Sequence, residues 1–256
     1  MIWLTEILLV STVVAQIASA SAARQEQPVL LSEGDLIVKS ELPSEIPPDK
    51  EHPLARKLIA AEEGEISCEP TPQTILVAHY RAEPTAQFSM KDDRVLVAVK
   101  QANKFEIVKV LQSETGIVDG KLSSDDDFEE EFIAIRERHF LYIRNRVSGS
   151  GGIVEHAVYA ISSDQKLSIV PFEDVTKSSI LKEGEELRNG GYRFAQGKFT
   201  FESGIYKARD AECCPSAGEF EAEFRLEGKF DQDPRSHAFE PDFKFVVANQ
   251  RRSSSR

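Results

Sequence analysis

The stretch FLYIRNRVSGSGGIVEHAVYAI, residues 140–161, contains two runs rich in β-branched and aromatic residues, separated by a loop of glycine and serine at 148–152. Runs of this composition are typical of β-strands, and a flexible five-residue connection between them predicts an antiparallel hairpin. Parallel strands would need a crossover helix, for which these residues leave no room. The stretch therefore favours an antiparallel β protein.

Similar runs recur on both sides of this hairpin, with short connections between them. The period-two alternation of apolar residues predicts strands at 35–39, 74–80, 94–100, 105–112, 132–138, 140–147, 153–161, 167–171, 192–195, 198–203, 205–208, 220–226 and 243–248. Short connections between consecutive strands favour a meander of hairpins.

Two segments have helical features. Residues 53–63 begin with Pro53 and carry the apolar residues Leu54, Leu58 and Ile59 at helical spacing before Gly64. Residues 174–182 follow Asp174, a good N-cap residue. We therefore expect an α+β fold, predominantly antiparallel β-sheet, with one or two helices covering a sheet face.

The N-terminal region has the pattern of an export signal. An apolar run at 7–18, too short to span a bilayer, precedes small residues that suit cleavage after Ala20 or Ala22. No Lys or Arg precedes the run, so an uncleaved anchor or a buried first helix remains an alternative. Cleavage predicts a periplasmic or extracellular protein with no membrane span left.

The rest of the chain divides into three parts by composition. Residues 23–52 are polar and rich in proline, which predicts a flexible spacer, and residues 250–256 read as a disordered tail. Between them, 53–249 reads as a single β-rich domain. The chain has 41% hydrophobic residues and a net charge of −12, so it can bury a core, and its charge argues against nucleic acid or an anionic membrane as a partner.

Three cysteines pose a pairing problem, because Cys68, Cys213 and Cys214 cannot all pair within one chain. A bridge from Cys68 to Cys213 or Cys214 is the first expectation for an oxidising compartment. A bridge between the adjacent Cys213 and Cys214 and a metal or redox role are the alternatives.

The segment DAECCPSAGEFEAEFRLEG, residues 210–228, resembles a segment of poorly characterised bacterial secreted proteins and lipoproteins, with a weaker similarity at 199–206. The resemblance implies a bacterial envelope or secreted location and no particular activity. The residues themselves predict a turn at Pro215 to Gly218, followed by a strand. One face of that strand carries Phe220, Ala222, Phe224 and Leu226, and the other carries Glu219, Glu221, Glu223 and Arg225.

Candidate binding residues are arginines that alternate along two adjacent strands: Arg136, Arg138, Arg144 and Arg146. They could present a basic ladder to an anionic ligand, or lie on an ordinary solvent-facing sheet. The acidic run at 125–131 lacks the ligand spacing of a calcium loop, so we interpret it as a solvated loop. The five histidines show no metal-ligand spacing, and those on strands, such as His79 and His156, are expected to be half-buried packing residues.

No set of nucleophile, base and oxyanion donor can be assembled from the sequence, and the glycines and serines of 148–152 do not form a nucleophile turn. We therefore expect no cofactor and no metal, and an exported, soluble, non-enzymatic binding or structural module. Its partner would be an envelope protein, peptide or polymer. The alternative is an envelope enzyme, either a hydrolase or a thiol redox protein that uses Cys213 and Cys214.

Overall fold

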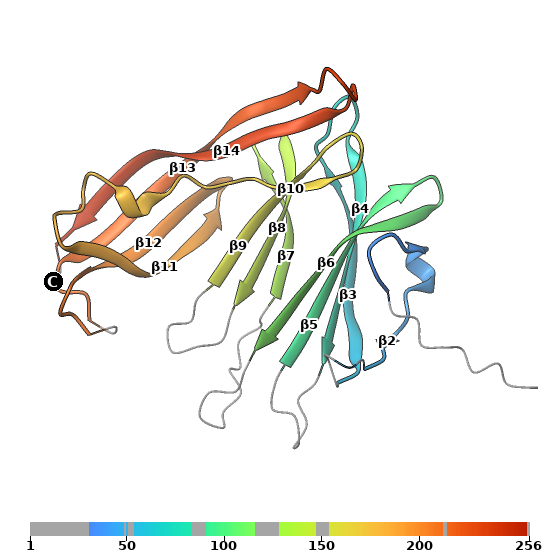
Figure 1. Cartoon of the computed structure of the whole chain (residues 1–256), viewed down its shortest axis with the longest axis horizontal. Coiled ribbons are helices and arrows are strands. Elements are labelled where there is room, and N and C mark those ends of the chain that lie inside the picture. The colour runs from blue at the N-terminus through green and yellow to red at the C-terminus, as the bar shows by residue number, and fades with distance from the viewer. Residues whose placement is uncertain are drawn as a thin grey trace, which may run out of the picture.

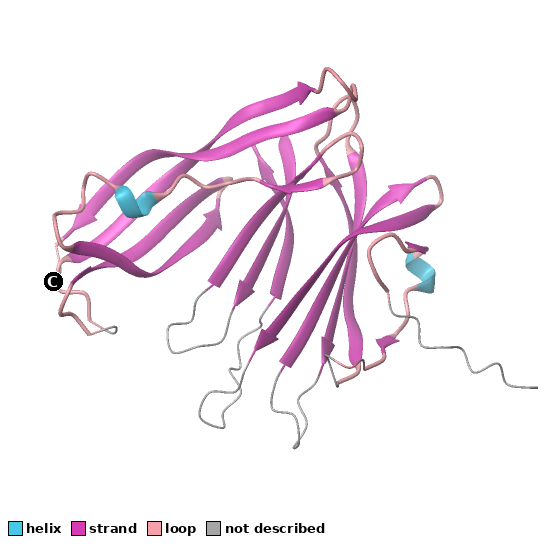
Figure 2. Ribbon diagram, in the orientation of Figure 1, coloured by secondary structure: helices cyan, strands magenta, loops and turns pink. Residues whose placement is uncertain are grey.

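The computed structural model describes residues 31–48, 50, 54–82, 91–115, 128–146, 154–211 and 214–254. Within these residues the chain forms three antiparallel β-sheets, arranged as successive layers (Figure 1). The described helical structure consists of two single turns of 3-10 helix, η1 (Lys39–Glu41) and η2 (Val175–Lys177) (Figure 2). Across these residues, no helix has the length and apolar character needed to cross a membrane.

The first layer is a six-stranded sheet with the strand order β1-β6-β5-β4-β3-β2. Its members are β1 (Leu36–Ile37), β2 (Glu45–Ile46), β3 (Arg56–Ile66), β4 (Gln73–Ala82), β5 (Lys91–Gln101) and β6 (Lys104–Thr115). The four long strands form a meander of neighbouring hairpins. The two short strands from the N-terminal segment extend its two edges.

The second layer, called the central sheet, has the order β10-β9-β8-β7. It consists of β7 (Phe128–Ile135), β8 (Arg138–Arg146), β9 (Val154–Ile161) and β10 (Leu167–Ile169). Strands β8 and β9 pair antiparallel, with Leu141 opposite Tyr159 and Arg146 opposite Val154. The hairpin predicted for 140–161 is thus confirmed.

The third layer, called the C-terminal sheet, has the order β11-β12-β13-β14. It consists of β11 (Glu185–Ala195), β12 (Lys198–Lys207), β13 (Gly218–Gln232) and β14 (Phe239–Ser253). The strands predicted at 198–203 and 205–208 are one strand, because Gly204 continues the pairing between β12 and β13.

The central sheet is buried on both faces, which explains the unbroken apolar run in β8. Leu141 and Ile143 pack against the six-stranded sheet, whereas Phe140 and Tyr142 point to the opposite side and pack against the C-terminal sheet. All four side chains are buried. A strand in the middle of three layers has no solvent face, so it cannot alternate apolar with polar residues.

Aromatic side chains fill the space between the central and C-terminal sheets. Phe199 of β12 is 1% exposed and lies within a ring of contacts. Its ring centroid is 5.2 Å from that of Tyr142, 5.2 Å from Phe172, 4.8 Å from Phe194 and 5.0 Å from Phe245. Pairs at these distances add stabilisation beyond the burial of their area.

The segment after β10 joins these two layers. Val170 donates its backbone N–H to Val158 of β9, at 2.8 Å. Three residues later the chain has moved to β14, where Phe245 donates to the Pro171 carbonyl and accepts from the Glu173 N–H, both at 2.8 Å. The segment is therefore hydrogen-bonded to both sheets and fixes one against the other.

The prediction of covering helices is wrong, and with it the α+β fold class. Most of the segment 53–63 belongs to β3, whose Leu58 pairs with Tyr80 and whose Ile59 is 48% exposed. Pairing with the neighbouring β4 overrides the local helical spacing, as tertiary context commonly does. The segment 174–182 contains only the single turn η2, although Asp174 does cap it by accepting from the Thr176 N–H at 2.9 Å.

Two predicted boundaries also change. In the described part of the expected flexible spacer, Leu31, Ile37 and Ile46 are buried against the six-stranded sheet, so this segment belongs to the folded domain. At the other end β14 runs to Ser253, so most of the expected disordered tail is a strand. Pairing with β13 orders these polar residues without requiring an apolar core around them.

Candidate functional site

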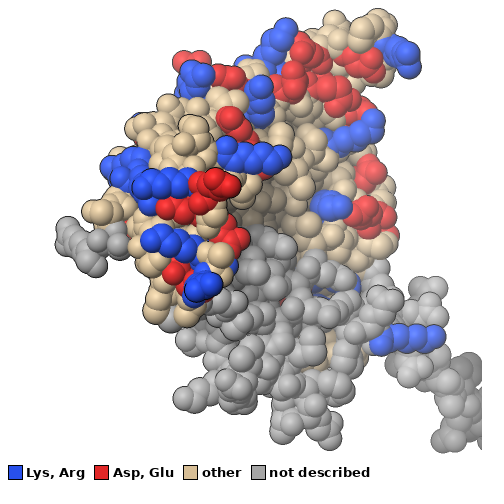
Figure 3. All heavy atoms as spheres, turned by 60° about the vertical axis from the view of Figure 1, so that its left-hand side comes forward, with Lys and Arg blue, Asp and Glu red and all other residues tan. Residues whose placement is uncertain are grey.

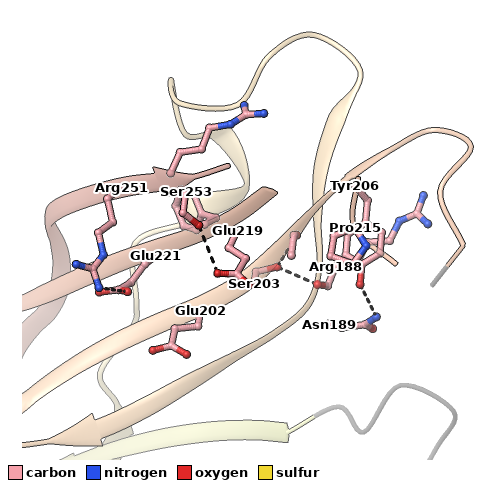
Figure 4. Close-up of a pocket in the computed structure, with 13 residues that line it drawn as sticks. Arg188, Asn189, Glu202, Ser203, Tyr206, Pro215, Glu219, Glu221, Arg251 and Ser253 are labelled. Atoms are coloured by element: carbon pink, nitrogen blue, oxygen red, sulfur yellow. Dashed lines mark hydrogen bonds and ion pairs between the residues drawn. The ribbon is translucent and has the colours of Figure 1, made fainter. Parts of the chain in front are cut away.

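A cleft of about 740 Å³ lies on the C-terminal sheet, on the face that points away from the central sheet. We call this the outer face. The space-filling view in Figure 3 shows Lys and Arg interspersed with Asp and Glu over this side of the molecule. All four strands and the loop before β13 line the cleft (Figure 4), with Arg188, Asn189, Glu202, Ser203, Gly204, Tyr206, Pro215, Glu219, Phe220, Glu221, Arg251, Arg252 and Ser253.

Strand register brings these side chains together from distant parts of the sequence. Glu221 of β13 lies between Glu202 of β12 and Arg251 of β14, and all three point to the outer face. In the next row Glu219 lies between Gly204 and Ser253. Apart from Pro215, which belongs to the loop before β13, the residues that line the cleft therefore lie on strands.

One end of the cleft is closed by Pro215 and Tyr206, which sit over Gly204. A Cβ atom at position 204 would come within 2.8 Å of the Tyr206 ring and 2.9 Å of Pro215, so only glycine fits beneath this wall. The Arg188 guanidinium lies over the Tyr206 ring, 5.4 Å from its centroid, and donates to Glu186 through Nε at 2.7 Å. The contacts of Arg188 with Tyr206 and with Glu186 therefore hold this wall of the cleft in place.

The loop that carries Pro215 is fixed by Asp210. Its Oδ2 accepts from the Lys207 N–H at 2.7 Å and from the N–H and hydroxyl of Ser216 at 3.0 Å and 2.9 Å. These backbone hydrogen bonds lower the pKa of Asp210. The turn predicted from the residues around Pro215 is thus present, and it positions one wall of the cleft.

The carboxylates of the outer face differ in their partners. Glu223 is paired with Lys198 at 2.7 Å, and Glu221 is paired with Arg251. Glu219 accepts only from the Ser253 hydroxyl, at 3.3 Å, and Glu202 has no ion-pair partner among the described residues. The two carboxylates without an ion pair among the described residues both line the cleft, although Arg251 attracts Glu202 at longer range.

Next to the cleft, an ion pair connects the two edge strands of the C-terminal sheet. Arg252 of β14 donates to Glu185 of β11 at 2.7 Å and 3.0 Å, and to the Ala217 carbonyl at 2.6 Å. The hydrogen bonds from Arg252 lower the pKa of Glu185 to about 2. This pair connects the edges of the sheet to the loop before β13.

We expect the variant Glu185→Gln to lose stability at neutral pH but not in strong acid. A carboxyl group with a lowered folded pKa stabilises the fold above its unfolded pKa of about 4.3, and that contribution is lost as the pH falls towards 2. Melting temperatures of wild type and variant should therefore differ at pH 6 and converge near pH 2. A constant difference across this range would contradict the assignment. The exposed Glu183→Gln is the matched control.

The candidate arginines whose side chains the structure describes, Arg136, Arg138 and Arg144, do not form one ladder. Arg136 lies in the turn between β7 and β8 with φ 58°, and Arg138 is stacked over Phe230 and Phe243, at 5.3 Å and 4.9 Å. Arg144 lies opposite His156 towards the other end of β8, and the side chain of Arg146 falls outside the described residues. The turn and the packing of Arg138 separate these charges, which the alternation in sequence could not reveal.

The expected bridge from Cys68 is absent, because Cys68 is a free, buried thiol in the core between the six-stranded and central sheets. Burial raises its pKa. Cys213 lies outside the described residues, so a bridge between Cys213 and Cys214 stays a prediction, as does a redox role. The first part of the acidic run, 125–127, and the loop 148–152 lie outside as well. Residues 128–131, which we interpreted as part of a solvated loop, belong to strand β7.

His79 belongs to a buried ionic group that the sequence did not indicate. It is 3% exposed, and its Nε2 lies 3.2 Å from Oδ2 of Asp93 on the neighbouring strand. Arg81 donates to both oxygens of Asp93, at 3.2 Å and 3.1 Å. Burial alone would raise the pKa of Asp93, but the hydrogen bonds from His79 and Arg81 outweigh it and lower that pKa.

His156 is a partly buried packing residue, as expected. Its ring stacks on Tyr142, and its Nδ1 is hydrogen-bonded to the Tyr142 hydroxyl. Burial, together with the charge of Arg144, lowers the pKa of His156 to about 4, so the ring is neutral near pH 7. Of the other described histidines, His139 is exposed near the start of β8 and His237 is exposed in the loop between β13 and β14, whereas His52 lies outside the described residues.

Most of the cleft residues could not be predicted from the sequence. The exception is the solvent-facing side of β13. Glu219, Glu221 and Glu223 were correctly placed on the polar side of that strand, but nothing in the sequence reveals which strands lie beside it. Within the described part of the chain, no three His, Cys, Asp or Glu residues are grouped so as to hold a metal ion. No protein-family model, curated protein or solved structure matches this chain.

Proposed function

We propose that this protein is an exported, non-catalytic binding module that holds an extended ligand in the cleft on the outer face of the C-terminal sheet. The observation that carries the proposal is the cleft itself, which crosses four strands and is lined mainly by polar and charged side chains. Concave surfaces with converging polar groups are where ligands bind. An envelope peptide, protein or polymer is the proposed class of partner.

The architecture behind the cleft supports binding. Its side chains project from strands of 10 to 15 residues, and the opposite face of these strands packs on the aromatic core. A surface held in this way loses little conformational entropy when a ligand binds. The hydroxyls that line the cleft act in this support: Ser203 donates to the Arg188 carbonyl at 2.9 Å, and Ser253 donates to Glu219.

Export rests on the sequence of the N-terminal region, which lies outside the described residues. The apolar run at 7–18 and the small residues after it support a signal peptide. A secreted location would bring the cleft into contact with envelope components. Mass measurement of the mature protein, with cleavage after Ala20 or Ala22, tests this part.

A steric block tests the cleft without disturbing the core. Gly191 lies opposite Glu202 on the outer face, and a Cβ atom at position 191 would have no neighbour within 4 Å. Gly191→Trp should therefore fold normally and place an indole beside Glu202. The matched control is Ala195→Trp, which changes an exposed residue farther along the same face of the same strand.

We expect immobilised wild type and Ala195→Trp to retain the same components of a bacterial envelope extract. Gly191→Trp should retain about tenfold less, a loss of about 1.4 kcal/mol, because the indole beside Glu202 would obstruct this side of the cleft. Quantitative mass spectrometry and glycan analysis of the retained material give the readout. Equal retention by all three proteins, or no enrichment over a bare matrix, would overturn the proposed binding site.

A further inference from the structure

We propose that the cleft recognises a single lysine or arginine side chain of an extended polypeptide, with its cationic group between Glu202 and Glu219. The inference rests on the proposed function and names the chemistry of the ligand. Two observations support it: the cavity, and the fact that some carboxylates around it are ion-paired and others are not.

Two carboxylates of the outer face that lie beyond the cleft, Glu223 and Glu227, are ion-paired within the chain. Lys198 pairs with Glu223 at 2.7 Å, and Arg225 pairs with Glu227 at 2.6 Å. At the edge of the cleft, Arg251 pairs with Glu221. Glu219 has a hydroxyl as its partner, and Glu202 has no ion pair of its own among the described residues, because Arg251, which attracts it electrostatically, is ion-paired with Glu221. Two carboxylates without a dedicated cation therefore line the cavity.

The sheet register makes this arrangement costly without a ligand. Glu202 and Glu221 are directly opposite each other on β12 and β13, where like charges are destabilising. Arg251 forms its ion pair with Glu221, on the far side of that residue from Glu202, and acts on Glu202 only through a longer-range attraction. A cation on the near side, next to Glu202 and Glu219, would relieve the remaining repulsion.

The surroundings favour an isolated cation on an aliphatic stem. Arg251 and Arg188 flank the two open carboxylates, so a polyamine or a polybasic segment would bring further positive charges against them. Pro215 closes the end of the cleft and offers apolar surface beside Gly204. The methylene groups of a lysine or arginine can lie along such a surface while the charged group reaches the carboxylates.

The test compares two peptides with blocked termini that differ only in the charged group of one side chain. The probes are acetyl-Gly-Gly-Lys-Gly-Gly-amide and the same peptide with norleucine in place of lysine, titrated into the ¹⁵N-labelled full-length mature protein. We expect the lysine peptide to shift cleft resonances and to bind about fivefold more tightly, the effect of an exposed ion pair. Glu202→Gln should remove most of this difference, whereas Glu183→Gln, the same charge change in an exposed loop, should retain it.

Three other outcomes would overturn the inference, and one of them would overturn the proposed function as well. If both peptides shift the cleft with equal affinity, the inference on charge is overturned while the proposed binding function stands. If Glu183→Gln and Glu202→Gln weaken the lysine peptide equally, the attraction comes from the net charge of the chain and the inference is likewise overturned. If no peptide shifts the cleft and Gly191→Trp also leaves envelope binding unchanged, both proposals fail.

Discussion

The variant Asp93→Asn is expected to lower the free energy of unfolding by about 3 kcal/mol, the lower end of the cost of removing one partner from a buried ion pair. Asp93 is 1% exposed and accepts from Arg81 through both oxygens. The amide removes the buried negative charge that faces both the Arg81 guanidinium and His79. The expected loss is at the lower end of this range because the Arg81 side chain is 17% exposed and keeps some contact with water.

Urea denaturation at pH 7 measures this change, with the exposed Glu183→Gln as a control expected to stay within about 0.5 kcal/mol of wild type. The effect should also depend on pH. Because the pKa of Asp93 is lowered in the folded protein, its contribution is present above the unfolded pKa of about 3.9 and is lost as the pH falls through the folded value. A variant as stable as wild type at pH 7 would show that the group is not a stabilising ion pair.

The variant Phe199→Ala is expected to cost about 3–5 kcal/mol, since it removes a buried ring from the centre of the aromatic core and leaves a cavity. The four rings around Phe199 come from different strands and from the linking segment, so they cannot all move in to fill the space. Phe199→Leu should cost less, because it conserves more of the volume.

Chemical denaturation again gives the measurement, and Ile169→Ala is the control, since Ile169 is 61% exposed. A loss below about 1 kcal/mol for Phe199→Ala would mean that the layers can close over the cavity. The same variant should also weaken ligand binding in the cleft, because Phe199 supports the strand that carries Glu202.

The strands could be predicted from the sequence because their signals are local. The hairpin at 140–161 is specified by two apolar runs and the short connection between them, and the alternation in β13 correctly separates Phe220 and Phe224 from Glu219 and Glu221. The helix expected at 53–63 shows the limit of this reasoning. Its apolar spacing suits a helix, but the strand that pairs with it is specified elsewhere in the chain.

The cleft could not be predicted for the same reason. Arg188, Glu202, Glu221 and Arg251 meet only through the register of four strands, and no local pattern encodes that register. Arg251 even falls in a segment whose composition suggests disorder. The sequence likewise draws attention to Cys68 as a bridging residue, whereas its burial in an apolar core makes it a packing side chain.

The central sheet, buried on both faces, has a consequence for how the protein can be divided. A fragment that ends before β11 would leave Phe140 and Tyr142 facing water, and a fragment that begins after β6 would do the same to Leu141 and Ile143. Exposed apolar faces of this kind lead to aggregation. Neither fragment would fold as a separate module, so fusions and truncations should preserve all three layers. The cleft depends for its rigidity on the central sheet, against which the C-terminal sheet packs.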